Sequence, residues 1–249
     1  MSNLISKLVA SVMKHEGSYD SINRNTDGAG LSVGIFQWPQ RTGGLAQVLK
    51  AYQTADPVMF RQIFGPNAAG LLRHAESRSL APLDGALLWE EPWASRFVQA
   101  GRHRPYQWAQ DRLARESVFV RSAFQGAFAL GSVTERILTV ILDAAVSQGP
   151  EYAVKVARRV QKQYAGQTVS QKTLLEAYLA SSSAHFRSGT EPPPSKVTGM
   201  SWRKVGNEWH KFAGQIDLYL NIQKRRGAFI TSTELADHEV TLTPELYPV

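Results

Sequence analysis

Apolar residues recur every three to four positions over the first sixteen residues and predict an amphipathic helix. Its apolar face holds Leu4, Ile5, Leu8, Val9, Val12 and Met13. Ser2 or Asn3 can cap its start, and Gly17 ends it. The next stretch, residues 18–38, is rich in Gly, Asn, Asp and Ser, with a short apolar run at its end. This composition predicts turns and a small β-hairpin or irregular strand.

Most of the remaining chain has the periodicity of helices. The helical patterns cover residues 45–52, 106–130, 134–147, about 150–164, 170–186 and 203–224, with shorter helices between prolines from Pro57 to Pro105. Residues 134–147 are apolar nearly all round, which predicts a buried central helix. The pattern therefore predicts a mainly α protein with one small β element.

Composition describes an ordinary globular chain with a basic body. Its 249 residues include no cysteine, which excludes thiol catalysis and cysteine-ligated zinc. The formal net charge is +7, but residues 227–249 carry −4 and the rest of the chain about +11. A basic body favours polyanionic partners such as nucleic acid, anionic lipid or an anionic wall polymer. The alternative is a solvated basic surface that serves solubility.

The length predicts one domain over residues 1–226, followed by an acidic tail or strand over 227–249. No apolar run approaches the roughly 18 residues of a membrane span, so we expect no membrane insertion. The first 17 residues carry Lys7, Lys14, His15 and Glu16 within the apolar pattern, unlike a signal peptide. We therefore expect a protein made in the cytoplasm that is carried to its place of action by other machinery.

Motifs for several chemistries are missing from the sequence. The six histidines form no metal-binding spacing, and there is no GxSxG, P-loop or GxGxxG motif. We expect neither a metal nor a cofactor. A basic stripe at helical spacing accompanies no nucleic-acid recognition motif, so we expect no nucleic-acid partner. The stripe consists of Lys155, Arg158, Arg159 and Lys162.

Glu16 is the first candidate catalytic residue. It falls on the same helix face as Val9, Val12 and Met13. A carboxylate at the end of an apolar face loses solvent, which raises its pKa towards the range of a general acid. The alternative is a last-turn glutamate whose side chain bends into water.

A second carboxylate and a hydroxyl follow in the glycine-rich stretch. Asp27 opens a turn with its side chain free, and Ser32 is a hydroxyl able to hold a water. Glycoside hydrolysis needs one carboxylic acid for the leaving oxygen and a second carboxylate that activates water. Asp20 competes for the second role, although it lies only one helical turn beyond Glu16.

These residues resemble the active-site stretch of the lysozyme superfamily. The match consists of Glu16-Gly17 followed by Asp27-Gly28-x-Gly30-Leu31-Ser32-Val33-Gly34-Ile35. Phage-type lysozymes have a helix-ending Glu-Gly, an Asp and then Thr-Ile-Gly-Ile. The sequence is more similar to the family 46 chitosanases, with further matches at 41–52, 93–97, 108–111 and 143–149. The resemblance covers roughly residues 4–165.

The resemblance implies an α+β lysozyme-like fold, with two helical lobes around a substrate cleft. It implies that Glu16 is the general acid, that Asp27 is the general base, and that Ser32 positions the water for an inverting reaction. Two departures stand out. The spacing from Glu16 to Asp27 is closer to phage lysozymes, and Gly44 replaces an aspartate of the chitosanase turn.

Charge separates the two substrates that this resemblance allows. Chitosan is a polycation, which a body near +11 repels, whereas peptidoglycan carries peptide carboxylates. We therefore expect a peptidoglycan strand as the partner. Candidate substrate-binding residues are the polar and aromatic ones after the hairpin and at the end of the central helix, namely Gln37, Trp38, Arg41, Thr42 and Gln148. For Trp38 a core position is the alternative, and for Gln148-Gly149 a plain helix cap.

Asp143 lies in the otherwise apolar central helix and needs a partner if it is buried. Arg112 and Arg115 are the candidates, and we expect Asp143–Arg112 to be a structural ion pair that braces the cleft.

Together these features predict a lysozyme-like peptidoglycan hydrolase, or muramidase, acting as a monomer. The missing signal fits a phage endolysin released through a holin, or an antibacterial effector delivered by a secretion system. An effector implies a cognate immunity protein. The alternatives are a chitosanase, a lytic transglycosylase that needs no Asp27, and a non-catalytic module that binds glycan or protein.

Overall fold

The computed structural model describes residues 2–26, 28–189 and 199–240, without the side chains of residues 2, 3 and 16. Asp27 therefore lies outside the described residues, and Glu16 is described by its backbone alone. The chain forms two compact units, one of Met13–Arg115 and one of Met1–Val12 with Glu116–Val249. We call them unit 2 and unit 1, respectively.

The first helix, α1 (Ser2–Glu16), is confirmed where the apolar periodicity predicts it. Ile5, Leu8 and Val12 are buried, so the apolar stripe faces the protein interior. The Gly17 N–H still bonds to the Met13 carbonyl at 3.3 Å before the chain turns away.

Unit 2 continues with a small antiparallel sheet, which confirms the predicted β element. Its strands, in the order β1-β2-β3, are β1 (Ile22–Arg24), β2 (Leu31–Val33) and β3 (Trp38–Pro39). Ser32 in the central strand faces Asn23 on one side and Pro39 on the other. β2 is buried along its whole length, so the sheet is part of the core of unit 2.

Five helices complete unit 2. They are α2 (Gly44–Ala55), α3 (Pro57–Phe64), α4 (Ala68–Glu76), α5 (Trp93–Gly101) and α6 (Arg104–Arg115). The break between α2 and α3 follows from the sequence, because Asp56 caps α3 and Pro57 is its first residue. The rings of Tyr52, Phe60 and Phe64 pack at centroid distances of 5.2–6.5 Å and fill the centre of the unit.

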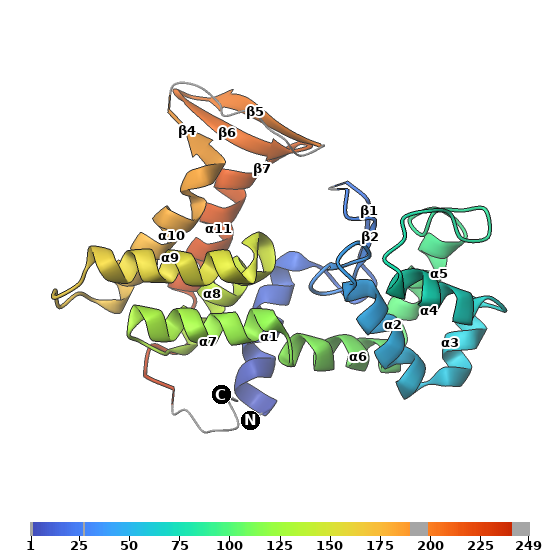
Figure 1. Cartoon of the computed structure of the whole chain (residues 1–249). Helices are drawn as coiled ribbons and strands as arrows, with labels where there is room; N and C mark the ends of the chain where they lie inside the picture. Colours follow the sequence, from blue (N-terminus) through green and yellow to red (C-terminus); the bar gives the residue numbers. More distant parts are fainter. Residues whose placement is uncertain (1, 27, 190–198, 241–249) are drawn as a thin grey trace. The chain divides into compact units, whose positions relative to one another are not determined.

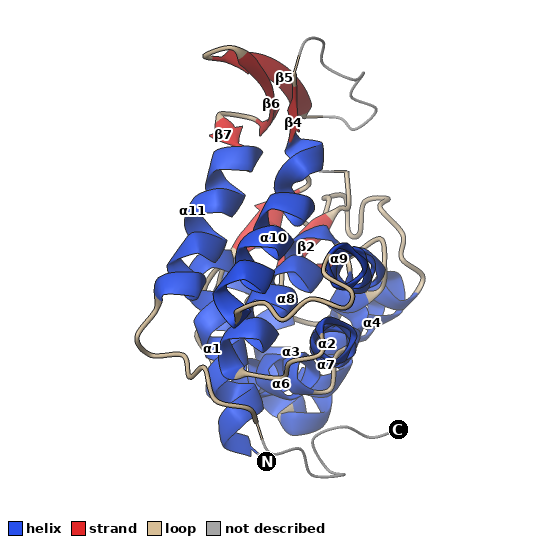
Figure 2. Ribbon diagram, turned by 90° about the vertical axis from the view of Figure 1, so that its left-hand side faces the viewer, coloured by secondary structure: helices blue, strands red, loops and turns tan. Residues whose placement is uncertain are grey.

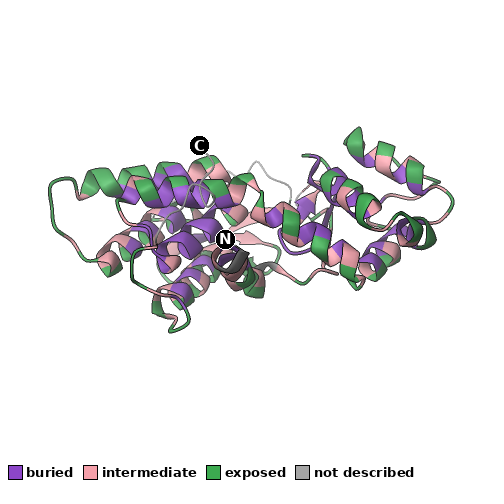
Figure 3. Ribbon diagram, turned by 90° about the horizontal axis from the view of Figure 1, so that it is seen from below, coloured by how far each residue is buried: buried purple, intermediate pink, exposed green. Residues whose placement is uncertain are grey.

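Unit 1 is a helical bundle around α8. Its helices are α7 (Val118–Leu130), α8 (Glu135–Gln148), α9 (Pro150–Gln163), α10 (Gln171–Ser183), the short 3-10 helix η1 (Ala184–Phe186) and α11 (Leu218–Thr231) (Figures 1 and 2). Every residue of α8 from Arg136 to Ala145 is buried, which confirms the predicted central helix. Other helices have buried and exposed sides, as the mixed colours along the ribbon in Figure 3 show. None of the helices in the described ranges has both the length and the apolarity of a membrane span.

The predicted helix over 106–130 is wrong, because α6 ends at Arg115 and α7 starts at Val118. The Ser117 hydroxyl accepts a hydrogen bond from the Val120 N–H and caps α7. Neither proline nor glycine marks this break, and the serine cap was the signal available in the sequence.

The predicted helix over 203–224 is also wrong, because its first half is a β-sheet. The strands are β4 (Arg187–Ser188), β5 (Met200–Val205), β6 (Glu208–Ala213) and β7 (Ile216–Asp217), in the order β4-β6-β5 with β7 beside β6. Val205 pairs with Glu208, which leaves a two-residue turn of Gly206 and Asn207. A two-residue Gly-Asn loop between alternating residues is a hairpin signal, so the helical interpretation took the wrong period.

The predicted boundary between residues 226 and 227 falls inside α11 and is wrong. The segment 232–240 then packs against the start of α8. Arg136 of α8 donates to the carbonyl oxygens of Phe229, Ile230 and Ser232 at 2.7–2.9 Å and forms an ion pair with Asp237. The Glu239 carboxylate accepts the Val133 N–H at 2.8 Å. Asp237 and Glu239 thus bond to residues at and just before the start of α8 within unit 1. Residues 241–249 lie outside the described ranges.

Candidate active site

Of the residues predicted to carry the chemistry, the structure describes the backbone of Glu16 at the end of α1 and Ser32 in β2, both in unit 2. Glu16 is the last residue of this helix, and Gly17 follows with a φ of 152°. A Cβ on Gly17 would lie 2.9 Å from Ser21 Oγ and 3.6 Å from Gln37 Nε2. The predicted binding residue Gln37 is therefore close to the residue that follows Glu16, and its amide donates to the Gly34 carbonyl at 2.9 Å.

The loop that carries Asp27 joins β1 to β2 and is fixed on both sides by asparagines. Asn23 Oδ1 accepts the Thr26 N–H at 3.0 Å, and Asn25 Oδ1 accepts the Gly30 N–H at 2.9 Å. Asn25 has a φ of 61°, a left-handed conformation that asparagine tolerates better than most residues. The described residues on either side of Asp27 are thus held in place by local hydrogen bonds.

Ser32 lies in the middle of β2 and is only 2 % exposed. Its place opposite Asn23 and Pro39 makes it a central residue of the small sheet. Its role in positioning a water stays a prediction.

Gln110 of α6 joins the segment after α1 to the turn after β2. It is fully buried; its Oε1 accepts the Ile35 N–H at 3.0 Å, and its Nε2 donates to the Tyr19 carbonyl at 3.0 Å. Gly34 makes this approach feasible, because a Cβ there would lie 1.8 Å from Gln110 Oε1. Gly34 and Gln110 thus pack directly against each other, next to the segment that follows Glu16.

A pocket of about 680 Å³ opens beside this arrangement, entirely within unit 2. Tyr19, Arg104, Trp108 and Asp111 line it together with Ala55, Pro105 and Gln107. The Tyr19 hydroxyl donates to Asp111 Oδ1 at 2.7 Å, and burial together with this carboxylate raises the pKa of Tyr19 far above its usual value. Tyr19 therefore stays protonated, while Trp108, 49 % exposed, presents an aromatic surface to solvent.

Asp20, the competitor for the second catalytic role, is occupied by neighbours. Its Oδ1 accepts a hydrogen bond from the Ser18 hydroxyl at 2.5 Å, and Oδ2 lies 3.4 Å from Arg102 Nε. The bond from Ser18, and then the contact with Arg102, lower the pKa of Asp20, so it is ionised at neutral pH.

The remaining predicted binding residues of unit 2 divide into two groups. Arg41 and Thr42 are exposed after β3, as a binding role requires. Trp38 is only 6 % exposed and packs against Phe36 at a centroid distance of 5.6 Å. The alternative of a core position describes Trp38, because a buried ring offers no face for a sugar.

Asp143 and Gln148 lie in unit 1 and belong to one buried network. Asp143 is fully buried, with Arg226 Nε 2.7 Å from Oδ2 and Arg225 Nε 2.7 Å from Oδ1. The predicted partner Arg112 is therefore wrong. The predicted helix stopped at 224 and gave the two arginines no place, whereas α11 packs them against α8.

The amide of Gln148 is used within the same network. Its Oε1 accepts from Arg226 Nη2 at 2.5 Å, and its Nε2 donates to the Ser182 carbonyl at 2.6 Å. Both ends of the amide bind protein groups, which corrects the expectation that Gln148 binds substrate. The side chain instead helps to satisfy the buried guanidinium.

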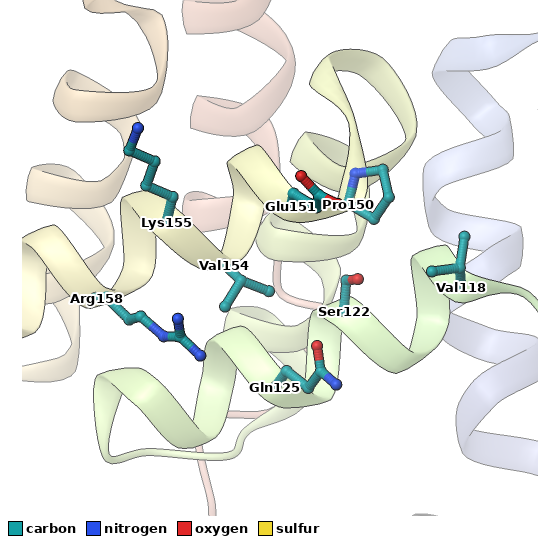
Figure 4. Close-up of a pocket in the computed structure, with 8 residues that line it drawn as sticks. All are labelled: Val118, Ser122, Gln125, Pro150, Glu151, Val154, Lys155 and Arg158. Atoms are coloured by element: carbon teal, nitrogen blue, oxygen red, sulfur yellow. The ribbon is translucent and has the colours of Figure 1, made fainter.

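A second pocket, of about 510 Å³, lies between α7 and α9 (Figure 4). Its polar lining consists of Ser122, Gln125, Glu151, Lys155 and Arg158. The last two belong to the basic stripe seen in the sequence. The pocket has one carboxylate, whereas acid–base glycoside hydrolysis uses two, so it is not the candidate active site.

No protein family and no curated protein matches the sequence. A native chitosanase from Bacillus subtilis MY002 matches in structure with a TM-score of 0.54 and 17 % identity, over 74 % of this chain and 77 % of that chain. A Gynuella sunshinyii GH46 chitosanase in complex with chitotetraose matches at 0.53 and 18 %, over the same shares. The chain has the lysozyme-like fold of the family 46 chitosanases. This confirms the fold that the ordered series of motifs implied.

Within this chitosanase-type fold, several residues that hold the segments around the candidate site in place were not predicted from the sequence. Gln110 and Asp111 belong to the matched stretch 108–111, but no role was predicted for them. Tyr19 carried no motif at all. The available signal was Gly34, a glycine in a buried strand turn, which indicates the close approach of another group.

Proposed function

We propose that the chain is a glycoside hydrolase that cleaves the β-1,4 bonds of bacterial peptidoglycan with inversion. The observation that carries the proposal is the fold, because its matched structures are chitosanases and the helix-ending Glu16 precedes the small sheet as the resemblance requires. In this mechanism Glu16 protonates the leaving oxygen. Asp27 activates a water on the opposite face of the sugar, and Ser32 orients that water.

Charge supports peptidoglycan as the substrate. The net charge of +7 attracts a polymer with peptide carboxylates and repels polycationic chitosan. The acidic groups beside α1 are occupied, since Asp20 contacts Arg102 and Asp111 accepts from Tyr19. A cationic sugar therefore finds fewer unengaged carboxylates there. Delivery through a holin or a secretion system, with an immunity protein in the second case, is part of the same proposal.

A chitosanase is the second candidate, and a specific observation favours it. The matched solved structures are chitosanases, one of them bound to chitotetraose. The loss of an aspartate at Gly44 and the basic charge argue against chitosan.

One experiment separates these functions. Purified peptidoglycan and chitosan are incubated separately with the wild type, Glu16→Gln, Asp27→Asn and the control Glu76→Gln, an exposed glutamate of α4. Products are identified by mass spectrometry. Reducing-end muramic acid from the wild type and Glu76→Gln, absent with either active-site variant, is the expected result.

Other outcomes overturn the proposal in distinct ways. Anhydro-muramic ends with Asp27→Asn still active indicate a lytic transglycosylase. Products from chitosan alone indicate a chitosanase. No product from either polymer leaves a non-catalytic binding module.

A further inference from the structure

The sheet of unit 1 has one face made of alternating tryptophans and lysines. It lies where α10 and η1 end and α11 begins (Figures 1 and 2). In the register of β5 and β6, Trp202 faces Lys211 and Lys204 faces Trp209. Directly opposed residues, and residues two apart along a strand, share a face of the sheet. These four side chains therefore form one surface, which we call the Trp–Lys face.

The charged side chains on the opposite face of the same sheet have partners within the protein. Arg203 lies 4.8 Å above the ring of Phe212, and Arg187 pairs with Glu208 at 3.4 Å. His210 is only 4 % exposed, and its Nδ1 lies 2.7 Å from the Asp217 carboxylate. This face thus joins the sheet to α11, and its charges are matched within the protein.

The charges and rings of the Trp–Lys face are not matched in this way. Lys204 is exposed, and Trp202, Trp209 and Lys211 are half-buried. Within the described ranges, neither lysine forms an ion pair and neither indole ring contacts another aromatic ring. Ile216 of β7, opposite Ala213, extends the same face with 54 % of its surface exposed. The surface therefore offers two ring systems, two cations and an apolar edge to a ligand.

The spacing of these groups suits a linear anionic glycan. The two tryptophans are diagonal neighbours, about 7–8 Å apart at the backbone, with one lysine beside each. An indole ring packs against the apolar face of a sugar ring, and an ammonium group attracts a carboxylate. The two lysines occupy the other diagonal of the same block, so each ring has an ammonium group on two sides that can attract an acidic substituent of a sugar chain.

We propose that the Trp–Lys face binds the glycan strands of peptidoglycan through their sugar rings and the carboxylates of their peptides. The inference rests on the proposed function and gives the same enzyme a second contact with its polymer, outside the catalytic residues. A long strand held at this face stays near the enzyme between cleavages, whereas a short soluble fragment gains nothing from it.

The test is co-sedimentation with insoluble peptidoglycan sacculi. The full chain is compared with Trp202→Ala/Trp209→Ala and Lys204→Gln/Lys211→Gln. The matched control Lys155→Gln/Lys162→Gln removes the same charge from exposed positions of α9. We expect each face variant to bind about tenfold more weakly, as the loss of two contacts predicts, and the control to bind like the wild type. Binding to sacculi stripped of peptides should fall less with the lysine variant than with the tryptophan variant.

Further readouts keep the inference separate from folding and from catalysis. Circular dichroism checks that each variant is folded. If the tryptophan variant unfolds, the lysine variant still tests the face, because it retains both indole rings. Cleavage of short soluble fragments should be unchanged in folded face variants. Face variants that bind like the wild type overturn the inference even if Glu16→Gln abolishes hydrolysis. Equal loss with the α9 control, or tight binding to short single-stranded DNA instead of sacculi, also overturns it.

Discussion

Arg226 Nε lies 2.7 Å from Asp143 Oδ2, and neither side chain has exposed surface. Arg226 also donates to Ser182 Oγ at 2.5 Å and to Ser147 Oγ at 3.0 Å, so its charge is matched and its donors are satisfied. A buried ion pair contributes little net stability when complete, but removing one partner leaves a charge without compensation.

Asp143→Asn should therefore lower the free energy of unfolding by about 3–5 kcal/mol. The control is Glu176→Gln, which breaks the exposed pair with Lys172 and should cost at most about 1 kcal/mol. Urea denaturation measures both values. An Asp143→Asn variant as stable as Glu176→Gln would contradict the structural role of this pair.

Gly34→Ala should destabilise unit 2 more than a change of backbone preference alone explains. The φ of 72° costs about 1–2 kcal/mol for alanine, and the new Cβ would lie 1.8 Å from Gln110 Oε1. We expect a total loss of at least about 3 kcal/mol. Gly131→Ala is the matched control, since its φ is 80° and no atom lies within 4 Å of its Cβ. Similar melting temperatures for the two variants would rule out the clash.

Stability should fall on acidification through His185. The ring lies near Tyr152 and Phe186, and burial, then the charges of Lys211 and Arg226, lower the pKa of His185 to about 4. Between the pKa of about 6.5 in the unfolded chain and that of about 4 in the folded chain, His185 is protonated only in the unfolded chain, so a falling pH favours unfolding. This contribution is complete above about pH 6.5 and is lost as the pH falls towards 4. The melting temperature of His185→Asn should therefore depend less on pH over this window than that of the wild type. An unchanged slope of melting temperature against pH would contradict this role of His185.

Trp108→Ala should weaken substrate binding with little effect on turnover, because the ring lines the pocket beside Tyr19 and carries no group that transfers a proton. An aromatic contact of about 0.5–1.5 kcal/mol corresponds to a rise in KM of about 2- to 12-fold. Steady-state kinetics on soluble glycan fragments provide the measurement. A large fall in kcat at unchanged KM would instead place Trp108 in the chemical step.

Arg136→Lys should detach the segment after α11 although it keeps the charge. The guanidinium donates to several carbonyls and to Asp237 at once, whereas an ammonium has three donors on a single atom. We expect a loss of about 2–3 kcal/mol. Arg121→Lys, an exposed position with a hydrogen bond to the Glu116 carbonyl, should change stability by less than about 0.5 kcal/mol. Equal effects would show that charge alone matters at Arg136.

The sequence predicted the elements whose information is local. The apolar stripe of α1 and the apolar residues of α8 determine how these helices are buried, and both predictions held. The motif series also led to the chitosanase-type fold. The sequence also predicted Glu16 at the end of its helix. The spacing of residues, however, does not show which residues from distant parts of the chain, such as Gln110, pack against the segment that follows.

Long-range pairings were out of reach for the same reason. Asp143 was expected to need a cation, yet its partners are 82 and 83 residues away in a helix whose bounds were predicted wrongly. The pairing of β5 with β6 was different, because it is local. Trp202 to Phe212 alternate between two faces on either side of the Gly206-Asn207 turn, and this hairpin signal was available in the sequence although the helical interpretation did not use it.

The helices α8 and α11 each contribute one arginine that bonds to the other helix. Arg226 of α11 binds the last turns of α8, and Arg136 at the start of α8 binds the end of α11. The two contacts lie at opposite ends of α8, so neither helix slides or peels away without exposing a guanidinium. Amide hydrogens along α8 should therefore exchange with deuterium at one common slow rate, set by the unfolding of the whole bundle rather than by fraying of its ends.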